Sequence, residues 1–518
     1  MNRAVLLRLL TAIGLALVLR CPVLDRRPLH NDEAVNAFKF GDLWTHGTYQ
    51  YDPNEYHGPS LYYATLAVAR LTSTPDFEHL TEVKLRLITV AFGIGLILLL
   101  PLVADGLGRK ATIWAAFFTA LSPAMVFYSR YYIHEMLLVF FAFLALAAGW
   151  RYWRSRKIGW ALLAGAGLGL MHATKETFPI LLVAAGLALA ANPLWSRYVE
   201  AAGSTAPASP LNRRHLAAAV TVWLVVALIL FSSFFTNASG LLDSVRTYLP
   251  WMHRAQGASP HIHPWSFYLH RLLFFQVAKG PVWTEALIFM LALVGAAAGF
   301  TRRGLADGNA SFVRFLALYT GAVTVAYSLI SYKTPWCLLN FWHGMILLAG
   351  IGVVAVLGSI QRRGLRVVAW ASLLIGVGHL GLQAWRADLP YAADPRNPYV
   401  YAQTSRDVLE LVRQVEELAS VSPQGNGMVI KVMAPEGDFW PLPWYLRRFN
   451  HVVWSEGIPP DPFAPVMIVA SKLQANLDEK KTHLMRHEFD LRPKVPLELY
   501  FELELWKQYL AKHPPPVD

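Results

Sequence analysis

KLRLITVAFGIGLILLLPLVA, residues 84–104, is a stretch in which Lys84, Arg86 and Thr89 carry the only polar side chains. An α-helix of about 20 such residues crosses a hydrocarbon core roughly 30 Å thick. Comparable apolar stretches occupy residues 4–24, 84–104, 111–128, 136–153, 158–173, 177–193, 215–236, 283–300, 312–331, 337–359 and 365–385. The sequence therefore predicts an α-helical polytopic membrane protein with about eleven transmembrane helices.

The composition agrees with a membrane protein, because the 518 residues are 55% hydrophobic and 15% charged. The formal net charge is +12, and much of it lies in alternate short loops that contain Arg109 and Lys110; Arg151, Arg154, Arg156 and Lys157; Arg197, Arg213 and Arg214; Arg302 and Arg303; and Arg362, Arg363 and Arg366. Loops of this kind are typically cytoplasmic. We expect the charge to attract anionic membrane lipids and not nucleic acid, for which no motif is present.

Two adjacent carboxylates, in Asn31-Asp32-Glu33, come shortly after the first apolar stretch. Ionisable groups at a membrane boundary are costly and usually functional. The alternation of loops puts further polar motifs on the same, extracytoplasmic side: Glu55-Tyr56-His57-Gly58-Pro59, Ser129-Arg130 with His134-Glu135, Thr174-Lys175-Glu176 and Tyr332-Lys333-Thr334-Pro335. A single active site built from helix ends would gather them in this way.

Three segments outside the spans have a recognisable character. The loop between the first two spans has two apolar faces that predict juxtamembrane helices. Residues 237–282 are rich in His and aromatic residues, which suit either membrane anchoring or stacking on sugar rings: Tyr248, Trp251, His253, His261, His263, Trp265, Tyr268 and His270. Residues 387–518 lack any span and predict an extracytoplasmic α/β domain, with a helix at 405–418 and strands at 428–433, 451–454 and 466–470.

The order of the motifs resembles that of the GT-C glycosyltransferases. Within them it is similar to the prokaryotic flippase-activity-associated family, relatives of the protein O-mannosyltransferases and of the lipid A aminoarabinose transferase. The motifs that carry the resemblance are Asp32-Glu33, His57-Gly58-Pro59, Arg86, Ser122-Pro123, Tyr128-Ser129-Arg130 with Glu135, Thr174-Lys175-Glu176, Tyr332-Lys333-Thr334-Pro335-Trp336 and the segment 440–447. The chain departs from the aminoarabinose transferases, where Lys-Pro-Pro stands in place of His57-Gly58-Pro59.

The resemblance implies a GT-C-like transmembrane domain at residues 1–386. It also implies transfer of a sugar from a polyprenyl-phosphate donor to an extracytoplasmic acceptor. Asp32 would be the general base, since an acceptor hydroxyl must lose its proton as it attacks the anomeric carbon. Glu33 is the second candidate for this role, and a helix N-cap is the structural alternative for Asp32. Glu135 would position the acceptor or share a divalent cation with Asp32 and Glu33, although no spacing is diagnostic of a metal site.

The departing phosphate needs cations, and Lys175, Arg130 and His57 are available on the expected side. Each has a structural alternative: a snorkelling helix end for Lys175, an interface anchor or a salt bridge with Glu135 for Arg130, and a hydrogen-bonded turn residue for His57. Glu176 and Lys333 would pair with neighbours or line the rim of the site. No Gly-rich phosphate-binding loop is present, so we expect no nucleotide cofactor.

The main alternative function is that of a transporter or flippase, or of a flippase accessory protein, for lipid-linked sugars. The same charged groups would then bind the lipid without breaking a bond. An inverted repeat with broken helices at the membrane midplane would favour transport. The clustering of polar motifs on one face favours transfer instead.

Overall fold

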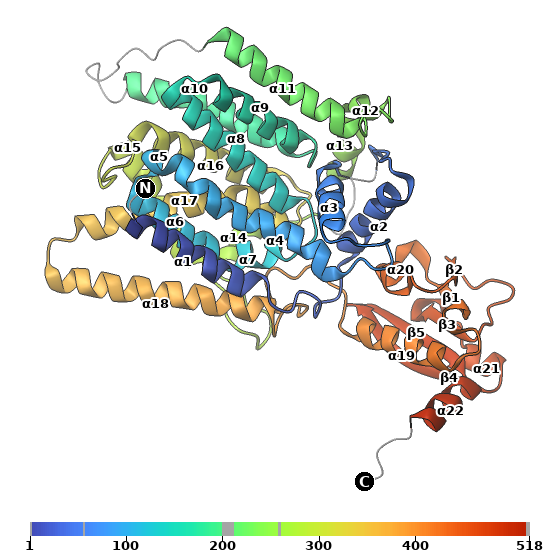
Figure 1. The fold of residues 1–518 in the computed structure, drawn as a ribbon. Helices are drawn as coiled ribbons and strands as arrows, with labels where there is room; N and C mark the ends of the chain where they lie inside the picture. The colour runs from blue at the N-terminus through green and yellow to red at the C-terminus, as the bar shows by residue number, and fades with distance from the viewer. Residues whose placement is uncertain (1–2, 55–56, 199–211, 257–260, 514–518) are drawn as a thin grey trace.

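The computed structural model describes residues 3–54, 57–198, 212–256 and 261–513. A helical bundle forms one end of the molecule and a small sheet forms the other (Figure 1). Glu55 and Tyr56 of the predicted His57 motif lie outside the described residues.

The apolar stretches all fall on helices. In chain order these are α1 (Arg3–Arg20), α4 (Glu82–Leu99), α6 (Arg109–Leu121) with α7 (Pro123–Ser129), α8 (Glu135–Ser155), α9 (Ile158–His172), α10 (Phe178–Tyr198), α11 (Arg213–Phe231), α15 (Ala286–Thr301), α16 (Ala310–Leu329), α17 (Leu339–Ser359) and α18 (Arg363–Asp388).

By length and composition, seven helices of the described residues can cross a membrane, or up to eight if α6 and α7, bent by 58°, form one span. All eleven predicted stretches are helices, and seven or eight of them meet this criterion. Two of the remaining helices, α9 and α15, have only 15 and 16 residues, fewer than the roughly 20 that a bilayer requires. The other, α1, carries Arg3, Arg8 and Arg20 within its 18 residues.

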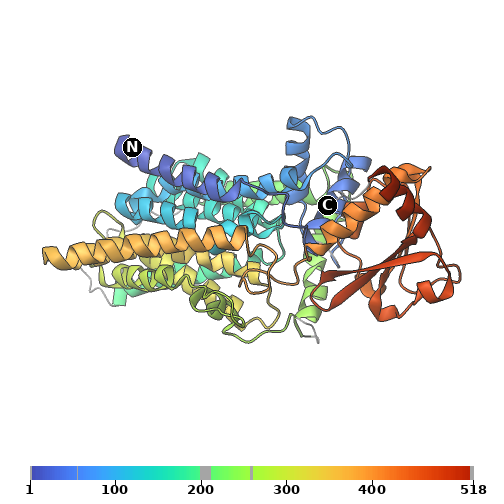
Figure 2. The same cartoon turned by 90° about the horizontal axis from the view of Figure 1, so that it is seen from below.

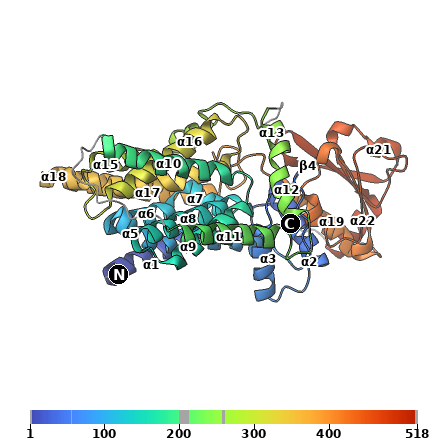
Figure 3. The ribbon, with the colours of Figure 1, turned by 90° about the horizontal axis from the view of Figure 1, so that it is seen from above.

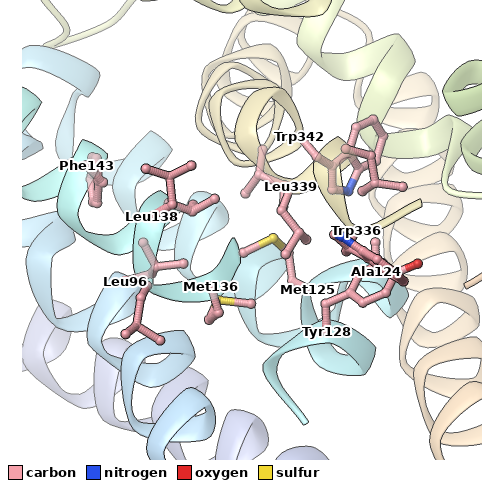
Figure 4. Close-up of a cluster of buried hydrophobic side chains, with 14 of the residues drawn as sticks. Leu96, Ala124, Met125, Tyr128, Met136, Leu138, Phe143, Trp336, Leu339 and Trp342 are labelled. Carbon is pink, nitrogen blue, oxygen red and sulfur yellow. The ribbon is translucent and has the colours of Figure 1, made fainter. Parts of the chain in front are cut away.

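The core of the bundle surrounds α17, which is buried on nearly every side. Trp342 and Leu339 of α17 belong to a buried apolar cluster with Met125, Leu138 and Leu96 (Figure 4). The backbones of α15 and α17 touch, because a Cβ atom on Gly295 would collide with a carbonyl of α17. Small residues at such crossings let membrane helices approach closely.

Short helices fill the space between the bundle and the sheet (Figures 1 and 3). They are α2 (Asn31–His46) and α3 (Ser60–Leu71) from the first loop, and α12 (Gly240–Arg246) and α13 (Tyr248–Gln256) from the His-rich segment. The last helix of that segment, α14 (Phe267–Leu273), lies beside the bundle helices (Figure 1).

The C-terminal sheet has the strand order β2-β1-β3-β5-β4. Its strands are β1 (Val429–Met433), β2 (His451–Ser455), β3 (Val466–Ala470), β4 (Leu484–Arg492) and β5 (Val495–Glu502). The first three are parallel, in register through Ile430 with Val452 and Val466, whereas β5 runs antiparallel to both β3 and β4. Helices α19 (Asp407–Val421) and α22 (Leu503–Lys512) accompany the sheet (Figure 2).

The short helix α20 (Leu442–Leu446) docks the sheet onto the bundle. The Tyr445 hydroxyl accepts a hydrogen bond from the backbone N–H of Leu29 at 2.8 Å. The Trp444 indole N–H donates to Glu82 Oε1, at the start of α4, over 2.6 Å. The sheet is therefore attached beside the N-terminus of α2, where the acidic pair lies.

Candidate active site

The N-terminus of α2 is capped by His30 and Glu33, and not by Asp32. His30 Nδ1 accepts the backbone N–H of Asp32 at 3.0 Å, and Glu33 Oε2 accepts the backbone N–H of His30 at 3.0 Å. Burial lowers the pKa of His30 against the opposing effect of the nearby carboxylates, which favours the neutral ring that this acceptor role needs. The Asp32 side chain is 44% exposed. The Asp32 carboxylate therefore does not serve as the N-cap of α2.

Glu33 is completely buried and bound to arginine. Arg86 donates from Nε to Oε1 at 2.8 Å and from Nη2 to Oε2 at 2.7 Å, and the backbone N–H of Tyr132 also donates to Oε1, at 3.0 Å. Arg27 lies 3.7 Å away. Burial alone would raise the pKa of Glu33, but Arg86 and Arg27 lower it to about 2. Glu33 is therefore an ionised anchor that fixes the start of α2.

A Tyr–His cluster lies close to Asp32. The Tyr401 hydroxyl hydrogen-bonds with His261 Nδ1 at 2.7 Å and with His263 Nε2 at 3.2 Å, and His30 Nε2 lies 3.1 Å from the Tyr401 carbonyl. Burial raises the pKa of Tyr401, and Asp32 adds to that rise. The two histidines of the 237–282 segment thus belong to the surroundings of Asp32.

Arg271, on α14, is a cation that the sequence did not single out. Its guanidinium stacks 4.2 Å above the ring of Phe267 and 5.4 Å from that of Phe275. Burial lowers its pKa, and its Nε is buried without a hydrogen-bond partner. Among the described residues no carboxylate pairs with it. It influences the pKa values of both Tyr401 and His263, so it lies near the same cluster as Asp32.

Lys333 joins this cluster from the loop before α17. Its ammonium donates to the carbonyl of His263 at 3.1 Å and to that of Ile330. Burial lowers its pKa. Since an ammonium has three N–H donors, two carbonyls leave one for a ligand.

A second group of predicted residues lies around α8 and the loop after α9. Lys175 and Glu135 form a buried ion pair, with side-chain exposures of 6% and 1%. Burial disfavours the charge on Lys175, but Glu135 holds the pKa of its ammonium well above the usual value. In this structure the Lys175 ammonium is therefore neutralised by Glu135.

Glu176 pairs with His57 at 2.8 Å, and the imidazole is 26% exposed while the carboxylate is nearly buried. The imidazole stacks on Trp251, with ring centroids 5.6 Å apart. Gly58, the next residue, lies where the segment before α3 touches the loop after α9. The Gly58 N–H donates to the Thr174 carbonyl at 3.1 Å, and a Cβ atom on Gly58 would collide with the backbone of Ala173. Only glycine fits this crossing.

Aromatic rings connect the group of residues around Asp32 with the group around Lys175. Trp251 lies 6.4 Å from Tyr332, and Tyr332 lies 4.9 Å from His261, measured between ring centroids. The motifs around His57, Lys175, Glu176, Lys333 and Asp32, which are far apart in the sequence, thus meet at one end of the bundle.

Arg130 caps α1, and its carbonyl accepts a hydrogen bond from Arg27, the neighbour of Glu33. Its Nη1 donates to the carbonyls of Leu19, Arg20 and Pro22, with the shortest distance 2.8 Å, and its Nε lies 3.5 Å from Asp388. A guanidinium at a helix C-terminus satisfies carbonyls that have no partner in the helix. These contacts occupy most of the Arg130 guanidinium, and its predicted contact with phosphate stays a prediction.

The three carboxylates considered for a divalent cation do not converge, since Glu33 is bound by Arg86 and Glu135 by Lys175. Within the described ranges, no group of three or more His, Cys, Asp or Glu side chains is placed to hold a metal ion.

Comparison with solved structures identifies the class of the fold. ArnT from Cupriavidus metallidurans in the apo state superposes with a TM-score of 0.61 at 14% identity, covering 96% of this chain and 98% of that chain. ArnT bound to undecaprenyl phosphate gives a TM-score of 0.59 at 15% identity, with the same coverage of 96% and 98%. The apo oligosaccharyltransferase of Archaeoglobus fulgidus gives 0.54 at 12% identity, over 87% of this chain and 64% of that chain. The fold is that of the GT-C glycosyltransferases.

Part of the sequence also matches a family profile. Residues 62–242, about a third of the chain, match the profile of dolichyl-phosphate-mannose-protein mannosyltransferase. Comparison with curated proteins gave no significant match. The chain is therefore an integral membrane protein with the GT-C fold, the fold that its motif order predicted.

Proposed function

We propose that the protein transfers a sugar from a polyprenyl-phosphate-linked donor to a hydroxyl group of an extracytoplasmic acceptor, with Asp32 as the general base. One observation carries the assignment of the base. Of the site carboxylates, Asp32 is 44% exposed and is held beside a buried, ion-paired Glu33. Glu135 and Glu176 are bound to Lys175 and His57. Asp32 is thus the carboxylate that an incoming acceptor can reach.

The similarity to ArnT supports a lipid-phosphate donor, because one of the matching structures of that protein holds undecaprenyl phosphate. In the proposed reaction, the acceptor hydroxyl gives its proton to Asp32 as its oxygen attacks the anomeric carbon. The bond between that carbon and the phosphate oxygen breaks, and polyprenyl phosphate leaves with an added negative charge. A general base of this kind typically contributes about 10² to 10⁴ in rate.

Arg271 and Lys333 are the cations that we assign to the departing phosphate. Arg271 is partly desolvated and has no carboxylate partner among the described residues, and Lys333 is bound only to neutral carbonyls. Cations placed in such a site stabilise developing charge better than solvated ones. In this proposal Lys175 and Glu135 organise the neighbouring helix ends, and His57, with its partly exposed ring over Trp251, contacts the sugar or the acceptor.

We also propose that this end of the bundle and the sheet are extracytoplasmic. The opposite end carries the basic loops with Lys110, Arg303 and Arg363, and such loops stay in the cytoplasm.

The test uses purified protein in detergent with a polyprenyl-phosphate sugar, and mass spectrometry measures released polyprenyl phosphate. Asp32→Asn should reduce release by about 10² to 10⁴ with unchanged thermal stability. Asp42→Asn, which alters an exposed carboxylate on the same helix, is the matched control and should remain active. If Asp32→Asn is fully active, the assignment fails. If wild-type protein moves the intact lipid across vesicles and releases no phosphate, it is a flippase instead.

A further inference from the structure

A second cavity lies at the other end of the bundle from Asp32. It has a volume of about 830 Å³ and is lined by residues of α1, α6, α17 and α18 and of the loop between α15 and α16. The start of α1 and the start of α18 both lie at the end of the bundle remote from the sheet (Figure 2). This cavity is separate from the site proposed for sugar transfer.

Three cations from three different helices line the cavity: Arg8 of α1, Lys110 of α6 and Arg366 of α18. No acidic residue is among the side chains that line it. The Arg366 guanidinium donates to the Ile360 carbonyl through Nη2 at 2.7 Å and Nε at 3.2 Å, which fixes the guanidinium at the start of α18. Within the described part of the chain, the side chains of Arg8 and Lys110 form no hydrogen bond or ion pair.

Neighbouring cations at this end of the bundle pair with carboxylates. Arg109 lies 3.7 Å from Asp307, and Arg151 and Arg154 lie 3.3 and 3.4 Å from Asp105. Carboxylates are thus available at this end of the bundle, yet none among the described residues pairs with Arg8, Lys110 or Arg366. Three converging positive charges without a protein anion leave a site with a strong preference for an external anion.

The rest of the cavity wall is apolar. Trp114 and Trp370 lie with ring centroids 5.8 Å apart, and Phe117, Val354 and Leu357 complete the wall. Tryptophan is typical of the membrane–water boundary. A ligand bound at this depth has a polar part in water and an apolar part in the hydrocarbon of the membrane. A fully soluble anion has no apolar part that could contact this apolar lining.

We propose that the cavity binds a diacyl phospholipid with a net-negative phosphate head group. The phosphate would contact Arg8, Lys110 and Arg366, and the acyl chains would lie against the two tryptophans and α17. Basic pockets between transmembrane helices commonly bind anionic head groups. The site would make the protein respond to the anionic lipid content of its membrane, independently of the reaction at Asp32.

Native mass spectrometry of the purified protein tests this proposal, with phosphatidylglycerol and phosphatidylcholine of identical acyl chains as probes. Wild-type protein should bind phosphatidylglycerol more tightly. Arg8→Gln, Lys110→Gln and Arg366→Gln should each weaken that binding about fivefold, since each cation near an anionic surface contributes about that factor. The triple variant should bind the two lipids equally. All three positions are exposed, and an unchanged thermal unfolding temperature in phosphatidylcholine will confirm that the variants are folded.

The matched control is the triple variant Arg302→Gln, Arg303→Gln and Arg363→Gln, which removes three charges from the same end but none from the cavity lining. It should keep the preference for phosphatidylglycerol. If both triple variants lose the preference for phosphatidylglycerol equally, the preference arises from general surface charge, and the proposal is overturned. A short polyprenyl phosphate that binds more tightly than phosphatidylglycerol and displaces it would also overturn the proposal, and would make the cavity a second site for the carrier lipid.

Discussion

Arg86 holds both oxygens of Glu33 through two parallel hydrogen bonds of 2.8 and 2.7 Å, and neither side chain is exposed to solvent by more than 1%. The pair connects α4 to the first turn of α2. Arg86 also donates to the carbonyls of Arg27 and Pro28, so the segment before α2 is fixed by the same guanidinium. The direction in which Asp32 leaves the helix thus depends on an arginine 53 residues away.

Glu33→Gln should destabilise the protein, because the substitution leaves Arg86 and Arg27 buried without a negative partner. Loss of one member of a buried ion pair typically costs about 3–5 kcal/mol. Thermal unfolding in detergent, followed by tryptophan fluorescence, should show a lower midpoint together with reduced transfer. Asp32→Asn should reduce transfer alone. A Glu33→Gln protein with wild-type stability and no activity would instead make Glu33 the base.

The stabilisation by Glu33 should depend on pH. Its pKa falls from 4.5 to about 2 on folding, so the stabilisation is complete above about pH 4.5 and is lost as the pH drops towards 2. A shift of this size corresponds to about 3 kcal/mol. The difference in unfolding free energy between wild-type protein and Glu33→Gln should therefore shrink by about that amount between pH 5 and pH 2. A difference that stays constant over this range would contradict the assigned ion pair.

Arg271→Gln should lower kcat for transfer by about 10² to 10³, the usual effect of removing one stabilising donor from a site of developing charge. Stability should change little, because the guanidinium has no ion pair to lose among the described residues. Arg271→Lys should recover part of the activity by restoring the charge. Arg246→Gln, at an exposed arginine of the same segment, is the control. Unchanged kcat and donor KM in Arg271→Gln would remove this residue from the phosphate site.

Lys175→Met and Glu135→Gln test whether Lys175 is a phosphate ligand or a structural partner. As members of a buried pair, each variant should lower the unfolding free energy by about 3–5 kcal/mol. The double variant should lose much less than the sum, because the two side chains are coupled. Unfolding of the four proteins in detergent gives the coupling energy. Normal stability of Lys175→Met with weakened donor affinity would restore the phosphate-binding role predicted from its motif.

The spans and the parallel strands were predictable because apolar runs leave the chain few alternatives. Residues 466–470, for example, are buried throughout as β3. The β4–β5 hairpin was missed because charged residues interrupt its apolar positions: Arg486, Glu488, Asp490 and Arg492 in β4 and Glu498 in β5. The sequence could not separate α9 and α15 from the longer spans, because they are as apolar as the long helices and differ from them in length.

The site was predictable as a set of motifs but not as a set of contacts. Asp32 and Glu33 are neighbours in sequence, and a helix turns successive side chains by about 100°, so one faces the core and the other does not. Which one is buried depends on where Arg86 lies. Arg271 had no motif around it, and it differs from a surface arginine by its contact with Phe267 and by having no carboxylate partner among the described residues.

The hydrogen bond between the Leu29 amide and the Tyr445 hydroxyl joins residues 416 positions apart. The Tyr401 carbonyl likewise contacts His30, the neighbour of the acidic pair, from far along the chain. A ribosome makes Tyr401 and Tyr445 after all the helices of the bundle, and chains fold from the N-terminus as they emerge. The surroundings of Asp32 therefore stay incomplete until the chain beyond α18 has been made.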